Sequence, residues 1–121
     1  MEADRRAALG SRGSVVMTTT GRRSGEPRSV PVAYFTIDGR VYVSGRPGFR
    51  RGWLANLRAN PEFTFSLRGP MRADLPAVAR PITDREERSR VLPTFAEAWG
   101  YPLDRMIAGS PLIEVTFPEA A

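Results

Sequence analysis

The sequence predicts a mainly β, α+β protein in which about six short, mostly antiparallel strands close into a small barrel with flanking helices. Short runs rich in β-branched and aromatic residues recur along the chain, separated by turn signals. The sequence shows no rhythm of alternating strands and helices, and no G-x-G-x-x-G motif, so a Rossmann fold is disfavoured. Closure into a barrel is the economical arrangement for such strands because it removes their exposed edges.

Length and composition indicate one domain. A chain of 121 residues, 41% of them hydrophobic, encloses one core, so we expect a single domain over residues 1–121. The Ala- and Arg-rich segment 1–12 is expected to form an amino-terminal helix or arm that ends near Gly10. Apolar runs of about five residues fall far short of the roughly 20 that cross a bilayer, and no apolar signal core is present. We therefore expect a cytoplasmic protein without stable membrane insertion.

The first half of the chain predicts three strands. Residues 14–20 are dense in β-branched side chains and run into a loop bounded by glycine. Residues 28–37 are apolar on both faces, which predicts a strand buried on both sides. Asp38-Gly39 separates this strand from residues 40–44, and such a two-residue connection predicts a β-hairpin.

A short helix and two further strands are expected in the middle of the chain. Apolar residues at helical spacing over 53–58 predict the helix, which Asn60-Pro61 ends. Residues 62–68 alternate between apolar and polar side chains, as a half-buried antiparallel strand does. The next strand is expected over 71–78.

A longer helix and a last strand complete the predicted fold. Thr83 and Glu86 have the spacing of a capping box, which predicts a helix capped by Thr83. Pro93 is expected to kink or divide this helix. Residues 111–117 place alternate apolar side chains on one face and predict a final strand that returns to the sheet.

The composition restricts the chemistry. The chain has no cysteine and no histidine, which removes thiolate chemistry, the commonest general base and the usual sulfur and imidazole metal ligands, and we predict no metal site. All 18 basic residues are arginine, and the net charge is +5. Because a guanidinium matches phosphate and carboxylate oxygens with its planar fork, these arginines indicate an anionic partner.

Two arginine-rich loops are candidate binding elements. Residues 18–25 place two arginines and a serine between glycines after a strand, where backbone amides can form an anion-binding concavity. A solvated turn with arginines for solubility is the competing interpretation. Residues 44–53 carry three more arginines and should lie beside the first loop, so both could converge on one pocket mouth. Trp53 fits either core packing or stacking near a flat ring.

These motifs together resemble a known family. The string TTGRRSGEPR at residues 19–28, then VPV at 30–32 and WLANLRANP at 53–61, resembles the deazaflavin-dependent nitroreductase and quinone reductase family in spacing and order. The resemblance implies an FMN-binding-like split β-barrel that binds reduced coenzyme F420. It further implies an oxidoreductase that transfers a hydride from the deazaflavin to a small organic acceptor, such as a quinone, a nitro compound or an activated alkene.

The resemblance also implies which residues bind the coenzyme. Its phosphate and glutamate tail would be held by Arg22, Arg23, Ser24 and Arg28. Its ring and linker would be lined by Pro31, Val32, Ser44, Gly52, Trp53 and Asn56. Three further arginines, in a loop shorter than the family's usual one, are Arg46, Arg50 and Arg51.

The substrate side departs from the family pattern. Where relatives place a tyrosine directly after the proline-apolar pair, this chain has Ala33, and its tyrosine follows at Tyr34. A one-residue offset in a strand reverses the side to which a residue points, so we expect a pocket unlike that of nitroimidazole reductases. Because the coenzyme carries the hydride, the protein needs only to supply a proton, and Tyr101, Ser44 or an ordered water could do so.

Several alternatives remain open. The same barrel could bind FMN or haem, or could bind F420 without turnover. The basic charge also allows a small nucleic-acid-binding barrel. The arginine-rich loops contain few aromatics that could stack on bases, Phe49 and Trp53 alone, so we predict no nucleic-acid partner. A small-molecule electron acceptor is the expected partner, and a homodimer is compatible with the size of the barrel.

Overall fold

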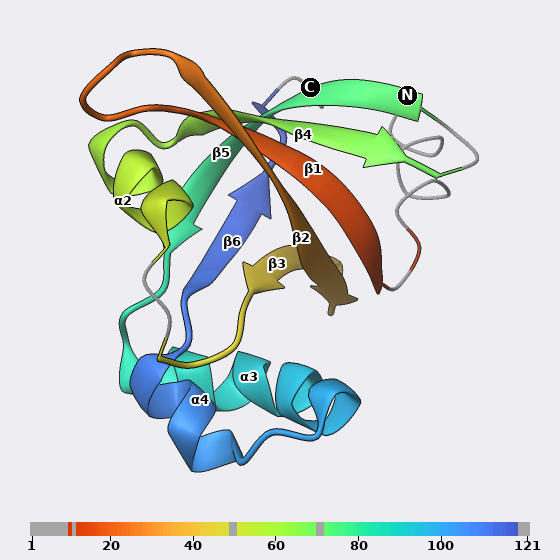
Figure 1. Ribbon diagram of the computed structural model, residues 1–121. Coiled ribbons are helices and arrows are strands. Elements are labelled where there is room, and N and C mark those ends of the chain that lie inside the picture. Colours follow the sequence, from red (N-terminus) through yellow and green to blue (C-terminus); the bar gives the residue numbers. More distant parts are fainter. Residues whose placement is uncertain (1–9, 11, 49–50, 70–71, 119–121) are drawn as a thin grey trace.

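The structure is a computed structural model that describes residues 10, 12–48, 51–69 and 72–118. Within them the chain forms six strands and three helices, labelled as in Figure 1. The strands are β1 (Arg12–Thr20), β2 (Pro27–Ile37), β3 (Arg40–Ser44), β4 (Glu62–Arg68), β5 (Arg72–Pro81) and β6 (Leu112–Thr116). The helices are α2 (Gly52–Ala59), α3 (Arg85–Trp99) and α4 (Leu103–Gly109). The expected amino-terminal helix over 1–12 lies largely outside the described residues.

The six strands close into one barrel. Its strand order is β1-β2-β3-β6-β5-β4, and every neighbouring pair, including the closing pair of β1 and β4, is antiparallel. Figure 1 shows α2 beside the turn between β1 and β2, and α3 with α4 as a layer under one end of the barrel. The predicted barrel with flanking helices is therefore confirmed.

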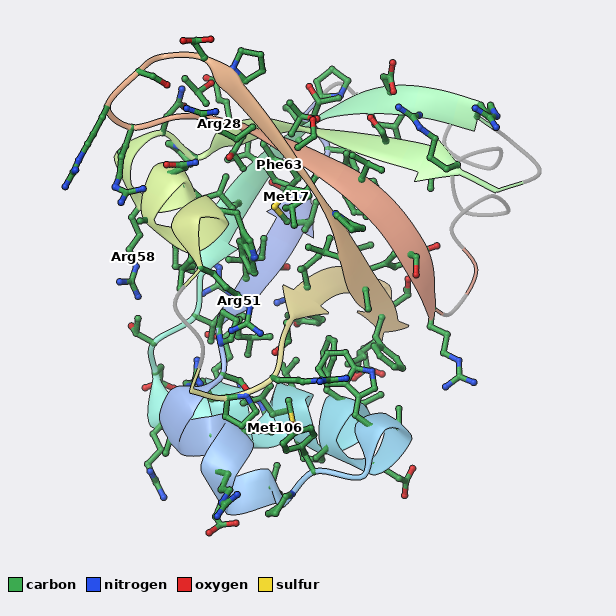
Figure 2. The ribbon with its side chains drawn as sticks, viewed as in Figure 1. Met17, Arg28, Arg51, Arg58, Phe63 and Met106 are labelled. Carbon is green, nitrogen blue, oxygen red and sulfur yellow. The ribbon has the colours of Figure 1, made fainter. Side chains whose placement is uncertain are left out.

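Alternating side chains fill the barrel interior. Met17, Val43, Phe65 and Ile113 are all fully buried there, and Tyr34 meets Phe65 edge to face with ring centroids 5.5 Å apart. Met17 lies inside the barrel in Figure 2. Burial of each such side chain stabilises the fold by roughly 1.5–3 kcal/mol, so this interior is the main source of stability.

A second core joins the helical layer to the outside of the barrel. Phe35 of β2 points away from the interior and meets Phe95 of α3 edge to face at 4.6 Å. Leu92 of α3 and Met106 of α4 are fully buried in the same cluster. This packing fixes the carboxyl-terminal end of α3 beside β2.

Strand β2 differs from the prediction in its burial. Only Tyr34 and Phe35 are buried, whereas the first half of the strand is half-buried or exposed. The apolar residues of that half line a pocket, and Val30 and Val32 are only partly buried against the barrel core. The prediction that both faces of this strand are buried is therefore wrong for its first half. The predicted hairpin is confirmed: Asp38 and Gly39 have φ values of 53° and 78°, the positive pair that a type I′ turn requires.

Helix α3 corrects two expectations. Its cap is Asp84, not Thr83: the Asp84 carboxylate accepts a hydrogen bond of 2.9 Å from the Glu87 amide, because the first helical residue is Arg85. Pro93 lies inside α3 without dividing it. The missing hydrogen bond costs about 3 kcal/mol, and burial of the helix's apolar face offsets it.

Helix α4 was not predicted from the sequence. Its seven residues carry a single buried apolar side chain, Met106, which gives too short a periodic pattern to detect. No helix in the described part of the chain is long and apolar enough to cross a membrane.

Candidate functional site

The loop between β1 and β2 is a compact turn. The Gly21 amide donates to the Glu26 carbonyl at 2.8 Å, and the Gly25 amide donates to the Gly21 carbonyl at 2.8 Å. Gly25 has φ of 74°, which favours glycine, and a Cβ on Gly21 would lie 2.6 Å from the Ser24 hydroxyl oxygen. These constraints hold Arg22 and the residues after it in a defined position beside α2.

Asn56 of α2 ties this loop to the barrel. Its Oδ1 accepts hydrogen bonds of 3.1 Å from both the backbone amide and Nη1 of Arg22. Its Nδ2 donates to the Thr19 hydroxyl at 3.0 Å. Thr19 is only 1% exposed and Asn56 only 5%, so the network is largely shielded from water. Asn56, expected to contact the coenzyme, therefore also positions the loop.

A basic pocket of about 430 Å³ lies between this loop, the start of β2 and α2. Three arginines line it, and no acidic residue is among its described lining residues. Arg23 and Arg28 form no hydrogen bond or ion pair with any described residue, so their N–H groups are available to a ligand. Figure 2 shows Arg28 on the loop side of α2. The pocket is lined by Thr19, Gly21, Arg22, Arg23, Ser24, Arg28, Ser29, Val30, Gly52, Trp53 and Asn56.

An aromatic pocket of about 690 Å³ adjoins the basic pocket. Strand β2 forms one wall, the end of β3 and the following loop form the floor, and the end of α3 forms the other wall. It is lined by Val30, Pro31, Val32, Ala33, Ser44, Gly45, Arg46, Arg51, Gly52, Trp53, Trp99 and Tyr101. Flat rings and small residues dominate, which suits a planar ligand.

The two pockets share Val30, Gly52 and Trp53. Trp53 is 8% exposed and belongs to the barrel core, yet it lines both cavities. Core packing and a position beside a bound ring, which the sequence left as alternatives, are thus both compatible with its placement. The two cavities therefore adjoin, one with a charged lining and the other with a flat, aromatic lining.

The two arginine-rich loops do not meet at a single mouth. Arg22, Arg23 and Arg28 line the basic pocket, whereas Arg46 and Arg51 line the aromatic pocket. The expectation of one shared mouth is therefore corrected to two joined cavities. Arg50, the third arginine of the second loop, lies outside the described part of the chain.

Arg51 packs closely over the floor of the aromatic pocket. A Cβ on Gly45 would lie 2.6 Å from the Arg51 guanidinium, so a larger residue there would displace the end of that side chain. Burial lowers the pKa of Arg51, although arginine remains charged at neutral pH. Arg46, in contrast, is exposed at the rim.

The two candidate proton donors differ. Ser44 is 4% exposed, and its hydroxyl donates to the Pro111 carbonyl at 2.6 Å, so its proton is engaged and its oxygen can only accept from the pocket. Tyr101 is half-buried and lines the same pocket. Its backbone amide donates to the Ala96 carbonyl at 3.1 Å, next to Gly100 with φ of 69°. This turn directs the chain at the end of α3 toward the aromatic pocket.

The offset between Ala33 and Tyr34 has the predicted consequence. Ala33 lines the aromatic pocket, whereas Tyr34 is 3% exposed inside the barrel, where burial raises the pKa of its phenol. Trp99 was not identified as a pocket residue from the sequence, because Val91, Leu92, Phe95 and Trp99 share one stripe at helical spacing, which is typical of core packing. Position in the last turn of α3 was the only signal for its exposure.

Fold and site define a small split-barrel protein with a positively charged pocket joined to a flat, aromatic one. The chain belongs to the F420H(2)-dependent quinone reductase family, whose model matches residues 4–113. An F420H(2)-dependent quinone reductase from Mycobacterium tuberculosis (strain ATCC 25618 / H37Rv) is 31% identical over 90 residues, which cover 71% of this chain and 54% of the relative. The chain thus spans about half the length of the curated relatives it matches.

Solved structures share the fold. A conserved hypothetical protein from Mycobacterium tuberculosis is similar with a TM-score of 0.76 and 21% identity, over 97% of this chain and 80% of that one. An F420-H2 dependent reductase is similar with a TM-score of 0.62 and 23% identity, over 85% of this chain and 93% of that one. At these identities the likeness establishes the split β-barrel fold alone.

Proposed function

We propose that this chain is an F420H2-dependent reductase that transfers a hydride from reduced deazaflavin to a small organic acceptor. The observation that carries the proposal is that the basic pocket and the aromatic pocket adjoin and share Val30, Gly52 and Trp53. A ligand that is anionic at one end and flat at the other is the kind of molecule these adjoining pockets fit. Membership in the F420H(2)-dependent quinone reductase family supports the same assignment.

The residues fit the coenzyme chemically. Unpartnered guanidinium groups are suited to a phosphate and carboxylates, which they bind through charge-assisted hydrogen bonds. Arg23 and Arg28 have no protein acceptor among the described residues, and Arg22 is held in place by Asn56. We assign the phosphate and glutamate tail to these three arginines with Ser24.

The ring would lie in the aromatic pocket. Pro31 and Val32 of β2 would face it from one side, with Trp53 and the backbone at Gly52 from the other. Ser44 would accept a hydrogen bond from it, since its own proton is donated to a carbonyl. When bound, the deazaflavin supplies the hydride. The protein's task is to orient the ring and to exclude water.

Tyr101 is the proposed proton donor and acceptor-side contact. It is the phenol that lines the aromatic pocket, and the Ser44 proton is engaged elsewhere. With Tyr101→Phe, we expect turnover to fall by about a hundredfold or more, the low end of the effect of a general acid, while coenzyme affinity stays within about twofold. Unchanged turnover would assign the proton to water.

A cofactor titration tests the assignment directly. Purified protein is titrated with F420 and with FMN, and binding is followed by absorbance and fluorescence. We expect F420 to bind at micromolar concentration or tighter, and FMN to bind more weakly. If FMN binds and F420 does not, the chain is a flavin-binding barrel. If F420 binds without oxidation by any acceptor, it is a binding protein.

The acceptor follows from a second assay. Oxidation of F420H2 is measured against quinones, nitroaromatics and activated alkenes at equal concentration. The flat aromatic pocket and the family favour quinones, and replacement of tyrosine by Ala33 at the pocket wall leaves space beside the ring. We also propose a cytoplasmic location and a homodimer for the working enzyme, the latter tested by light scattering.

A further inference from the structure

A third cavity, the arginine pocket, lies between α2, the start of α3 and the end of α4. It measures about 440 Å³, and four arginines line it: Arg51, Arg58, Arg85 and Arg88. No acidic residue is among its described lining residues. Figure 2 shows Arg51 and Arg58 on the side of α2 that faces the helical layer, away from Arg28. The concentration of positive charge is therefore separate from that of the basic pocket.

Arg88 provides a half-buried charge without a countercharge. Its guanidinium donates to the carbonyls of Ile82, Met106, Ile107 and Ser110 at 2.6–3.0 Å, and none of the described carboxylates contacts it. Burial lowers the pKa of this group. Carbonyl oxygens satisfy its N–H groups but leave its net charge unmatched, which is unfavourable in a partly desolvated place.

Ser110 supplies a second unsatisfied group in the same cavity. Its residue is 4% exposed, and its hydroxyl oxygen has no hydrogen-bond partner among the described residues. Buried hydroxyl groups are nearly always hydrogen-bonded. Ser110 lines the arginine pocket, although its hydroxyl oxygen is itself buried. Rotation of this side chain toward the cavity would bring the hydroxyl to an acceptor placed there.

The mouth of the cavity adds two uncommitted cations. Arg58 and Arg85 are exposed and form no ion pair or hydrogen bond with any described residue. Of the acids beside Arg85 in the sequence, Asp84 caps α3 and Glu87 pairs with Arg80. The third, Glu86, is exposed and forms no ion pair with any described residue. Both guanidinium groups are therefore free to approach a ligand.

We propose that the arginine pocket is a second oxyanion-binding site, which takes a phosphate or carboxylate group. An acceptor-only anion satisfies the Ser110 hydroxyl and matches the charge of Arg88, while Arg58 and Arg85 close over it. The site shares Arg51 with the aromatic pocket and no residue with the basic pocket. It does not depend on the proposed coenzyme, because a free anion is sufficient to occupy it.

The test uses the full chain and inorganic phosphate. Amide chemical shifts of ¹⁵N-labelled protein are followed during a phosphate titration, with ionic strength held constant by sodium chloride. We expect saturable shifts at Ser110 and Ile107. Arg85→Ala and Ser110→Ala should each raise the half-saturating concentration by about fivefold or more, because each removes one donor to the anion.

Matched variants locate the effect. Arg105→Ala removes an exposed arginine of α4 that has no described partner and lies outside the cavity. Arg23→Ala alters only the basic pocket. Both variants should leave the half-saturating phosphate concentration at Ser110 and Ile107 unchanged. Melting temperatures verify that each variant is folded. Non-saturating shifts, the same shifts with chloride alone, shifts confined to the basic pocket, or unaltered binding in Arg85→Ala would overturn the proposal.

Triglutamate identifies the source of the anion. If the peptide shifts Ser110 and Ile107 at lower concentration than phosphate, the site takes a carboxylate chain such as the tail of the coenzyme. If phosphate alone shifts them, the site takes a separate small anion. Both results support an oxyanion site, and neither depends on turnover.

Discussion

Removal of the Asn56 side chain tests how the basic pocket is held together. Asn56→Ala deletes three hydrogen bonds: two accepted from Arg22 and one donated to Thr19. Thr19 is 1% exposed, so its hydroxyl would lose its partner without gaining water. The change should therefore weaken both the fold and the placement of Arg22.

The magnitude follows from those contacts. Each hydrogen bond contributes about 1 kcal/mol net, and a buried group left unpaired costs about 1–3 kcal/mol. The bond to the Arg22 guanidinium is partly exposed and contributes least. We expect the free energy of unfolding to fall by about 2–4 kcal/mol and the affinity for F420 to fall by about tenfold, which corresponds to about 1.4 kcal/mol.

Urea denaturation and the F420 titration measure the two effects. The matched control is Asn60→Ala, which removes one exposed hydrogen bond of 3.1 Å to the Glu62 amide and should cost about 1 kcal/mol or less. A double-mutant cycle with Thr19→Val should give a coupling energy of about 1 kcal/mol with Asn56→Ala. Additive effects, or a loss no larger than that of the control, would refute the role assigned to Asn56.

Three further changes have defined outcomes. Arg23→Ala should weaken F420 binding by about 1–3 kcal/mol. Its melting temperature should be almost unchanged, because Arg23 contacts no described residue by hydrogen bond or ion pair. Isothermal calorimetry measures the affinity, and a thermal melt measures the stability. Trp53→Ala should lower the free energy of unfolding by about 3–5 kcal/mol and also weaken F420 binding, measured by urea denaturation and titration, because Trp53 is shared by core and cleft. The Arg80 guanidinium lies 2.5 Å from the Glu87 carboxylate and lowers its pKa. The pair therefore stabilises the fold at pH values above the unfolded pKa of about 4.3. This contribution is lost as the pH falls through the lower pKa of the folded state. Glu87→Gln should therefore flatten the acid limb of stability against pH, at a cost of about 1 kcal/mol or less at neutral pH because the pair is partly exposed.

Matched substitutions separate these effects from general damage. Arg105→Ala, an exposed arginine outside every site described above, should leave F420 binding unchanged. Trp53→Phe should recover part of the lost stability. Glu97→Gln, at an exposed position on the same helix as Glu87, should not alter the acid limb. Equal losses in the test variant and its control would contradict the assigned contact in each case.

Local chemistry in the sequence determined most of the secondary structure. Two-residue periodicity marked β4, and Asp38-Gly39 fixed the β2–β3 hairpin because both positions need positive φ. Strand parity also separated Ala33 from Tyr34, since alternate residues of a strand face opposite sides. The loop motif at residues 19–28 and the helix motif at residues 53–61 indicated the family and the residues that line the two pockets.

Other features depended on contacts between distant segments. The continuity of α3 through Pro93 and the existence of α4 accompany packing of both helices against the barrel. The apolar first half of β2 is only partly buried and lines a pocket, which depends on how distant segments pack around it.

The sequence by itself determined that this protein is a small barrel with arginine-rich loops and no histidine or cysteine chemistry. Only the tertiary structure decided which arginines are committed and which are available. Arg22 is held by Asn56 and Arg88 by carbonyls, whereas Arg23 and Arg28 meet no protein acceptor among the described residues. The physical reason is that a guanidinium's role depends on the acceptors that folding brings within reach, and these come from segments far apart in the chain.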